Sequence, residues 1–242
     1  MGYMTKFDII IPTTEKDLDT LEECIKSAKL FIDGYRKIIV ISKERYTKNA
    51  DWFPESNFPF SLENLKEYIG DHWRLGWYYQ QLLKLYALFV IPDILDNLMC
   101  LDSDTIFLKK TIFFKDGIPY YNYSGAYHKP YFKHMKKLDS CLSRQDSKKS
   151  GITHHMIFNI EILRNLFYKV EKNHNLEFWR VFMKMVDKDE KSGASEYEIY
   201  FNYVWKEYND RIKLRKLKWE NSNSIDYNKD LHYVSRHSYL RK

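Results

Sequence analysis

Leu98-Met99-Cys100-Leu101 runs directly into Asp102-Ser103-Asp104. Four apolar residues in a row predict a short buried strand, so the acidic triplet stands at its carboxyl end. Two carboxylates this close repel each other, and the arrangement needs hydrogen-bond donors or a cation to compensate it. In open α/β sheets, ligands bind outside the carboxyl ends of the strands. The stretch therefore predicts an α/β fold with a site for a divalent ion, Mn²⁺ or Mg²⁺, shared with a diphosphate.

Two other Asp-x-Asp triplets show that position matters more than pattern. Asp17-Leu18-Asp19 stands at the start of a predicted helix, where acidic residues suit the helix dipole. Asp187-Lys188-Asp189 lies in a polar stretch after a predicted helix, and we expect it to be solvated. Only the triplet at 102–104 follows a buried strand, and it alone is predicted to bind metal.

The chain before this triplet predicts a strand, a helix and a second strand. Residues 6–13 are largely apolar and reach a proline, and residues 36–42 form a second apolar run. Between them, apolar residues recur every three or four positions from Leu18 to Ile32, which predicts a helix ended by Gly34. Two strands joined by a helix are expected to be parallel.

The rest of the chain predicts further alternation of helices and strands. Residues 43–75 are expected to be irregular because two prolines and a glycine interrupt them, and a strong helix follows from Gly76 to Pro92. No linker or repeat divides the sequence, so a single α/β domain spanning 1–242 is predicted. The other expected strands are 105–108, 120–127, 156–159 and a half-exposed basic strand at 211–219, and the other helices are 130–142, 160–172, 176–187 and 196–208.

Composition excludes some classes of protein. Of 242 residues, 44% are hydrophobic and 30% charged, which is a globular balance and excludes a wholly disordered chain. No apolar run approaches the roughly 20 residues of a membrane span, and the first residues lack the apolar core of a secretory signal. The three cysteines form no disulfide framework or zinc motif. We expect a cytoplasmic protein without a membrane span.

Several motifs resemble a known family. Pro12-Thr13, the stretch Gln80–Ala87 with its lysine, and the Asp102 triplet look like the first half of a GT-A glycosyltransferase. Gly151–Asn159 and Ser195–Tyr200 resemble later blocks of a poorly characterised family of glycosyltransferase-like proteins from bacteria and large viruses, distantly related to the glycogenin-like transferases. The resemblance covers nearly the whole chain.

The resemblance implies a Rossmann-like mixed sheet flanked by helices in one domain. Residues 1–108 would form the nucleotide-sugar-binding half, and residues 109–242 the acceptor half with the C-terminal tail. The implied activity is metal-dependent transfer of a sugar, a hexosyl group in particular, from a nucleotide-diphosphate donor to a hydroxyl acceptor, which could be a glycan. A UDP-sugar is the favoured donor, and no nucleic acid is expected as a partner.

The same resemblance implies a set of site residues. Asp104 would bridge Mn²⁺ or Mg²⁺ to the diphosphate, Asp102 would hold the metal or the ribose, and His237 would complete the metal site. Lys84 would pair with the diphosphate or the donor sugar, and thereby aid catalysis. The remaining donor-binding candidates are Thr13 and Glu15 at the nucleoside, Ser103, His154, His155 and Arg236.

The two glutamates that open a predicted helix are the candidates for catalysis. The resemblance to GT-A glycosyltransferases implies that an acidic block here faces the acceptor, where a carboxylate could take the proton of the attacking hydroxyl. Residues two apart on a helix point about 200° apart, so at most one of Glu196 and Glu198 is expected to face the site, and we favour Glu196. His154 and His155 are adjacent, so one is expected to point inward and the other outward.

Three other functions fit parts of the sequence. The net charge of +6 and the 17% aromatic content are compatible with a nucleic-acid-binding protein, although the basic residues are dispersed. A sugar-phosphate nucleotidyltransferase would use the same sheet, but the loop Pro12-Thr13-Thr14-Glu15 lacks the glycines that close on phosphates. A degenerate transferase that binds sugars without turnover is the third alternative.

Overall fold

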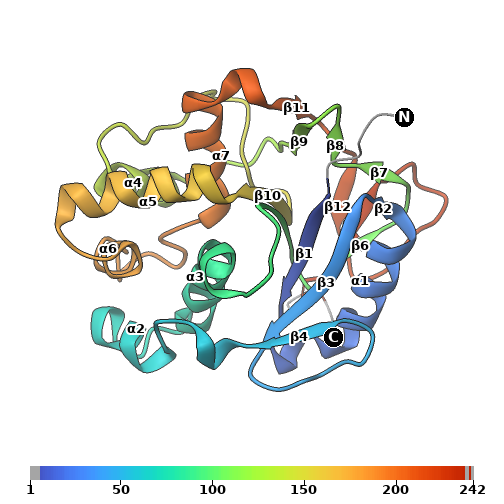
Figure 1. The fold of residues 1–242 in the computed structure, drawn as a ribbon, viewed down its shortest axis with the longest axis horizontal. Helices are drawn as coiled ribbons and strands as arrows, with labels where there is room; N and C mark the ends of the chain where they lie inside the picture. The colour runs from blue at the N-terminus through green and yellow to red at the C-terminus, as the bar shows by residue number, and fades with distance from the viewer. Residues whose placement is uncertain (1–5, 238–239, 241–242) are drawn as a thin grey trace.

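A five-stranded mixed sheet forms the centre of the protein. The computed structural model describes residues 6–237 and residue 240. The sheet has the strand order β10-β5-β1-β3-β4, in which β10 is antiparallel to β5 and the other neighbours are parallel (Figure 1). Its strands are β1 (Phe7–Pro12), β3 (Tyr35–Ser42), β4 (Asp51–Pro54), β5 (Asn97–Leu101) and β10 (His155–Asn159). This arrangement confirms the predicted α/β class.

The predicted strand–helix–strand unit is present. Helix α1 (Leu18–Phe31) buries the apolar positions that define its periodicity and leads back to β3, which pairs in parallel with β1. The helix ends earlier than predicted, because Ile32 is already extended and opens the two-residue strand β2 (Ile32–Asp33). Gly34 follows with φ of +90°, a conformation that favours glycine, and turns the chain into β3.

The expectation of an irregular segment at 43–75 is wrong. This segment contains β4 and helix α2 (Leu62–Ile69). Pro54 is compatible with β4 because β4 is an edge strand and lacks a second neighbour to which the missing N–H would donate. Helix α2 begins with a capping box in which Ser61 Oγ accepts from the Asn64 N–H at 3.3 Å and the Ser61 N–H donates to Asn64 Oδ1 at 3.1 Å.

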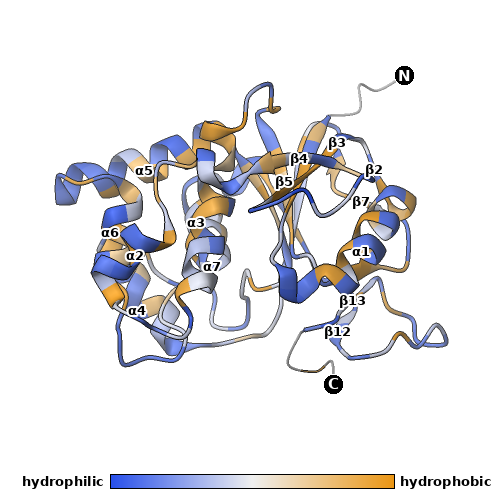
Figure 2. Cartoon of the chain, turned by 90° about the horizontal axis from the view of Figure 1, so that it is seen from below, coloured by the Kyte–Doolittle hydropathy of each residue, from blue (hydrophilic) through white to orange (hydrophobic). Residues whose placement is uncertain are grey.

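Helices cover both faces of the sheet. Helix α1 lies on one face, and α3 with most of the other helices lies on the opposite side (Figure 1). Hydrophobic residues gather on the central strands and on α3 (Figure 2). These helices are α3 (Leu75–Val90), α4 (Lys129–Leu138), α5 (Ile160–His174), α6 (Phe178–Lys184) and α7 (Glu196–Glu207), with short 3₁₀ turns at Glu15–Asp17, Glu55–Asn57 and Asn209–Arg211. The predicted helices agree with them within a few residues.

The aromatic residues largely fill the core. Phe167 and Phe178 stack with centroids 4.0 Å apart, and Phe60 packs edge-on against Tyr86 at 5.1 Å. Trp179 is 2% exposed and lies in the same cluster. Aromatic content is therefore explained in large part by packing between α2, α3, α5 and α6.

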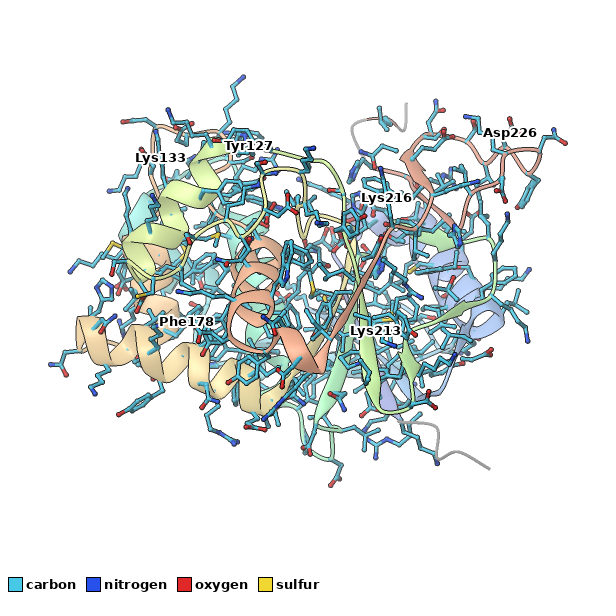
Figure 3. The ribbon with its side chains drawn as sticks, turned by 90° about the horizontal axis from the view of Figure 1, so that it is seen from above. Tyr127, Lys133, Phe178, Lys213, Lys216 and Asp226 are labelled. Atoms are coloured by element: carbon cyan, nitrogen blue, oxygen red, sulfur yellow. The ribbon has the colours of Figure 1, made fainter. Side chains whose placement is uncertain are left out.

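The expected basic strand at 211–219 is also wrong, because two strands of different sheets replace it. Strand β11 (Lys213–Arg215) pairs in parallel with β9 (Ile118–Asn122), whereas β12 (Trp219–Asn221) pairs with β13 (Tyr233–Ser235). Lys213 begins β11, whereas Lys216 lies in the turn after it, and the two are apart in the view of Figure 3. The turn between the strands is fixed by the Leu217 N–H, which donates to Asn122 Oδ1 at 2.8 Å.

Strands from both halves of the chain pair with each other. Strand β10 adds to β5, and β13 pairs antiparallel with β6 (Thr105–Phe107). Two short strands, β7 (Thr111–Ile112) and β8 (Phe114–Lys115), complete the structure by pairing with β2 and β9. The C-terminal segment thus returns to the end of β5. Among the described residues, no helix has the length and apolarity to cross a membrane.

A buried histidine predicts how stability depends on pH. His134 on α4 is 2% exposed, its Nε2 lies 2.9 Å from the Phe182 carbonyl oxygen, and burial lowers its pKa to about 4. In the unfolded chain the pKa is about 6.5. Between these values the unfolded state binds more protons, so stability falls as the pH falls through this window.

We expect His134→Gln to flatten this dependence. The amide can still donate to the Phe182 carbonyl but cannot take up a proton. The slope of unfolding free energy against pH, measured by urea denaturation between pH 6.5 and 4, should fall by up to about 1.4 kcal/mol per pH unit. An unchanged slope would show that His134 is not buried in its neutral form.

Candidate active site

A cavity of about 470 Å³ opens at the carboxyl end of β5. The chain turns at the triplet Asp102–Asp104, where the Thr105 N–H donates to the Asp102 carbonyl at 3.0 Å. All three residues of the triplet line the cavity. A second cavity of about 620 Å³ lies beside it at the end of β1. The two share four lining residues: Asp17, Arg74, Trp77 and Gln80. They therefore form one continuous groove.

Lys84 lies at the centre of an ionic cluster beneath the first cavity. It projects from α3 with 4% of its surface exposed. Its Nζ is 2.6 Å from Asp102 Oδ1, 2.7 Å from Glu196 Oε1 and 3.2 Å from the Tyr197 hydroxyl, which in turn donates to Asp102 Oδ1 at 2.8 Å. An ammonium has three donors, and here all three have acceptors. Lys84 thus joins α3, the end of β5 and the start of α7.

The pKa values of this cluster follow from burial and from the ammonium. Burial by itself would raise the pKa of Asp102, but Lys84 and the hydrogen bond from His154 hold it below its ordinary value. Burial would lower the pKa of Lys84, and the two carboxylates raise it instead. Burial raises the pKa of Glu196, although Lys84 opposes that rise. Asp102 and Lys84 are therefore both charged at neutral pH.

Asp104 faces two histidines rather than the lysine. Its Oδ2 is 3.0 Å from His237 Nδ1, and its Oδ1 accepts from Ser235 Oγ at 3.1 Å. His154 Nδ1 lies 3.3 Å from Asp102 Oδ2. One ligand atom each of Asp104, His154 and His237 can be chosen so that all three lie within 4.8 Å of one another. A carboxylate and two imidazoles can ligate a divalent transition-metal ion.

An unusual backbone conformation places His154 in this cluster. Its φ is +64°, in the left-handed region that a non-glycine residue rarely adopts. Its carbonyl accepts from the Asp102 N–H at 3.0 Å, which ties the loop to the triplet. The loop before it is fixed by Glu198, whose carboxylate accepts from Ser150 Oγ and from the Gly151 N–H at 3.3 Å. Glu198 is thus a buried anchor of the histidine loop.

Only one of the two candidate glutamates lines the cavity. Glu196 lines it and Glu198 does not, in agreement with the helical spacing. His154 lines the cavity, whereas His155 points into the core, 5.3 Å from the Phe113 ring and 5.2 Å from the Tyr233 ring. Burial lowers the pKa of His155 to about 3. Donor contact by His155 stays a prediction, and its side chain lies away from both cavities.

The second cavity gathers the candidates that follow β1. Thr13 and Glu15 both line it. Thr13 is 3% exposed, and its Oγ1 is buried and makes no hydrogen bond among the described residues. Arg236 lines neither cavity. Its backbone N–H donates to the Asp104 carbonyl at 2.8 Å, but its side chain is engaged with Glu23, whose Oε2 lies 2.6 Å from Nη1.

Several lining residues were not singled out from the sequence. Tyr197 lies between the two candidate glutamates in the sequence, and its aromatic side chain is typical of a residue in the hydrophobic core. Arg74 and Trp77 open α3, where the sequence offers only a strong helix signal. Further residues of this kind line the first cavity, among them Tyr131, Ser192, Trp219 and Asn221. Their common signal is polar or aromatic character near an element end, which many surface residues share.

Comparison with known proteins addresses the fold. No protein-family model and no curated protein matches the chain. Among solved structures 194 chains are similar, including the crystal structure of mouse xyloside xylosyltransferase 1 in its apo form. Its TM-score is 0.51 and its identity 11%, over 98% of this chain and 100% of that chain. This likeness confirms the predicted glycosyltransferase-type Rossmann-like fold, and the narrower bacterial and large-virus family stays a prediction.

Gly151 provides a test of the histidine loop. A Cβ at this position would lie 2.5 Å from Phe201 Cβ and 2.6 Å from the Tyr197 carbonyl oxygen, so backbone would have to move. We expect Gly151→Ala to lower the free energy of unfolding by about 1–3 kcal/mol. Gly125→Ala, where no atom lies within 4 Å of the added Cβ, is the control and should change it by less than about 0.5 kcal/mol. Equal effects in urea denaturation would contradict the packing described.

Proposed function

We propose that this chain is a metal-dependent glycosyltransferase that moves a sugar, a hexosyl group in particular, from a nucleotide-diphosphate donor to a hydroxyl acceptor. The observation that carries the proposal is the convergence of Asp104, His154 and His237 at the carboxyl end of β5, inside a groove. The similarity of the fold to a xylosyltransferase supports the reaction class. A UDP-sugar is the favoured donor and a glycan one candidate acceptor.

The residues present fit a divalent ion. His154 Nε2 is buried and makes no hydrogen bond within the described part of the chain, so a ligand or ion would satisfy it. Asp104, His154 and His237 would hold Mn²⁺ or Mg²⁺, with Asp102 beside them. When bound, the ion neutralises charge that develops on the departing diphosphate. Asp102 differs from the other three in being fixed by Lys84 and Tyr197.

The groove can be assigned in two parts. The nucleoside would occupy the cavity at the end of β1, where Thr13 Oγ1 has no hydrogen-bond partner among the described residues and Glu15 lies at the wall. The sugar and the acceptor would occupy the cavity at the end of β5, beside Ser103 and Glu196. Lys84 would act there by holding Asp102 and Glu196 in place, since its three donors already have acceptors.

Glu196 is the group proposed to take the acceptor proton. It lines the cavity, and burial raises its pKa although Lys84 opposes the rise. A raised pKa makes a carboxylate a stronger base. Pairing of strands from residues 1–108 with strands from 109–242 supports one domain whose donor and acceptor halves meet at β5.

The first test concerns the metal. Wild-type protein should melt at a higher temperature with one nucleotide sugar of a UDP-, GDP-, CMP- and dTDP-sugar panel, and only when Mn²⁺ is present. Asp104→Asn should lose this shift. Asp189→Asn, in an exposed Asp-x-Asp triplet, is the matched control and should keep it. Manganese-independent single-stranded RNA binding with a steep salt dependence would instead favour the nucleic-acid alternative.

The second test concerns the proposed base. Glu196→Gln should lower kcat for sugar transfer by about a hundredfold or more, because general-base catalysis contributes at least this much. Glu207→Gln, at the exposed end of the same helix, is the control and should leave kcat near wild type. Melting temperatures of both variants establish that they fold. A Glu196→Gln variant that is folded and retains a tenth or more of kcat would exclude this role.

A further inference from the structure

The diphosphate of a nucleotide sugar carries two negative charges, which one divalent ion balances. A further negative charge develops on the diphosphate as it leaves, and a cation of the protein can stabilise it. Lys84 was the predicted partner, but its ammonium lies within 3.2 Å of three acceptors, two of which are carboxylates. A phosphate contact by Lys84 would have to displace one of these buried hydrogen bonds.

Arg74 occupies a different environment. It precedes α3 and lines both cavities, so it lies where they join. Of the four residues that the cavities share, it alone is a cation. It forms no ion pair with any residue in 6–237, and its Nε is buried and makes no hydrogen bond there. A buried donor without an acceptor is costly, and this one lies in a groove wall.

Two tryptophans hold the guanidinium. Its central carbon is 4.6 Å from the Trp73 ring centroid and 5.0 Å from the Trp77 ring centroid. A guanidinium that contacts aromatic rings keeps its N–H donors free for an anion. The edge of a guanidinium matches two oxygens of a phosphate, which makes arginine the preferred residue for bidentate phosphate recognition. The N-terminal end of the 16-residue helix α3 adds to the positive potential.

We propose that Arg74, positioned by Trp73 and Trp77, binds the diphosphate of the donor at the junction of the two cavities. The assignment rests on the proposed function, because that function puts the nucleoside beside Thr13 and the sugar beside Asp104. A donor that spans both cavities places its diphosphate between them. Arg74 then neutralises the leaving group on the side away from the metal ligands.

The experiment measures binding of three probes by isothermal titration calorimetry with Mn²⁺ present: inorganic pyrophosphate, UDP and uridine. Pyrophosphate tests the diphosphate site independently of the base. Arg74→Gln should weaken binding of pyrophosphate and of UDP by about tenfold or more, because a charge-assisted bidentate contact is lost. Its affinity for uridine should match wild type. Arg74→Lys keeps the charge but not the planar guanidinium. Its affinities for pyrophosphate and UDP should lie between those of wild type and of Arg74→Gln.

Arg180→Gln is the matched control. Arg180 stacks on Trp179 at 4.3 Å and lines neither cavity, so all three affinities should be unchanged. The proposal is overturned if wild-type protein does not bind pyrophosphate, if folded Arg74→Gln binds pyrophosphate and UDP as wild type does, or if uridine is weakened equally.

The outcomes separate this proposal from the proposed function. Loss of pyrophosphate binding in Arg74→Gln, together with no metal-assisted uptake of any nucleotide sugar by wild type, would retain the diphosphate site and refute the transferase. Sugar transfer by wild type with unchanged UDP affinity in Arg74→Gln would retain the transferase and refute the role of Arg74.

Discussion

The buried ammonium of Lys84 is the constraint on which the groove depends. A charge that is 4% exposed in an apolar helix is tolerated only where opposite charges and hydrogen bonds surround it. Asp102 and Glu196 supply them from the end of β5 and the start of α7. Removing either carboxylate would leave part of the ammonium charge uncompensated. The ion pairs therefore hold α3, the end of β5 and the start of α7 in one geometry. The position of Asp104, two residues beyond Asp102, follows from that geometry.

The same constraint gives the two aspartates of the triplet different environments. Asp102 is neutralised by Lys84 and fixed by the Tyr197 hydroxyl, so its carboxylate acts within the protein. Asp104 contacts the His237 imidazole and the Ser235 hydroxyl instead. Within the described residues Asp104 forms no ion pair with a lysine or an arginine, so its carboxylate is the one that a metal ion would approach. Different partners thus reduce the repulsion expected between the two carboxylates. A metal ion would compensate the remaining negative charge of Asp104, whereas Lys84 already compensates that of Asp102.

Local pattern and chemistry predicted the parts of the protein that local interactions determine. The helix periodicity of α1 and the apolar run of β5 are visible in sequence, and so is the acidic triplet at the strand's end. The capping box of α2 was also readable at Ser61 and Asn64, but the neighbouring prolines obscured it. Contacts across the chain were not readable. The acceptors around Lys84 come from the end of β5 and the start of α7 and depend on how α3 packs against them, which no local pattern encodes.

The candidate metal cluster shows why its formation is tied to the whole fold. Asp104 lies at the end of β5, His154 in a loop anchored by Glu198, and His237 just beyond β13. Strand β13 reaches this place because it pairs with β6, directly after the triplet. Separations of 50 and 83 residues mean that the unfolded chain presents no such cluster. An ion that binds these three residues would therefore stabilise the folded state, and its affinity would include the free energy of folding.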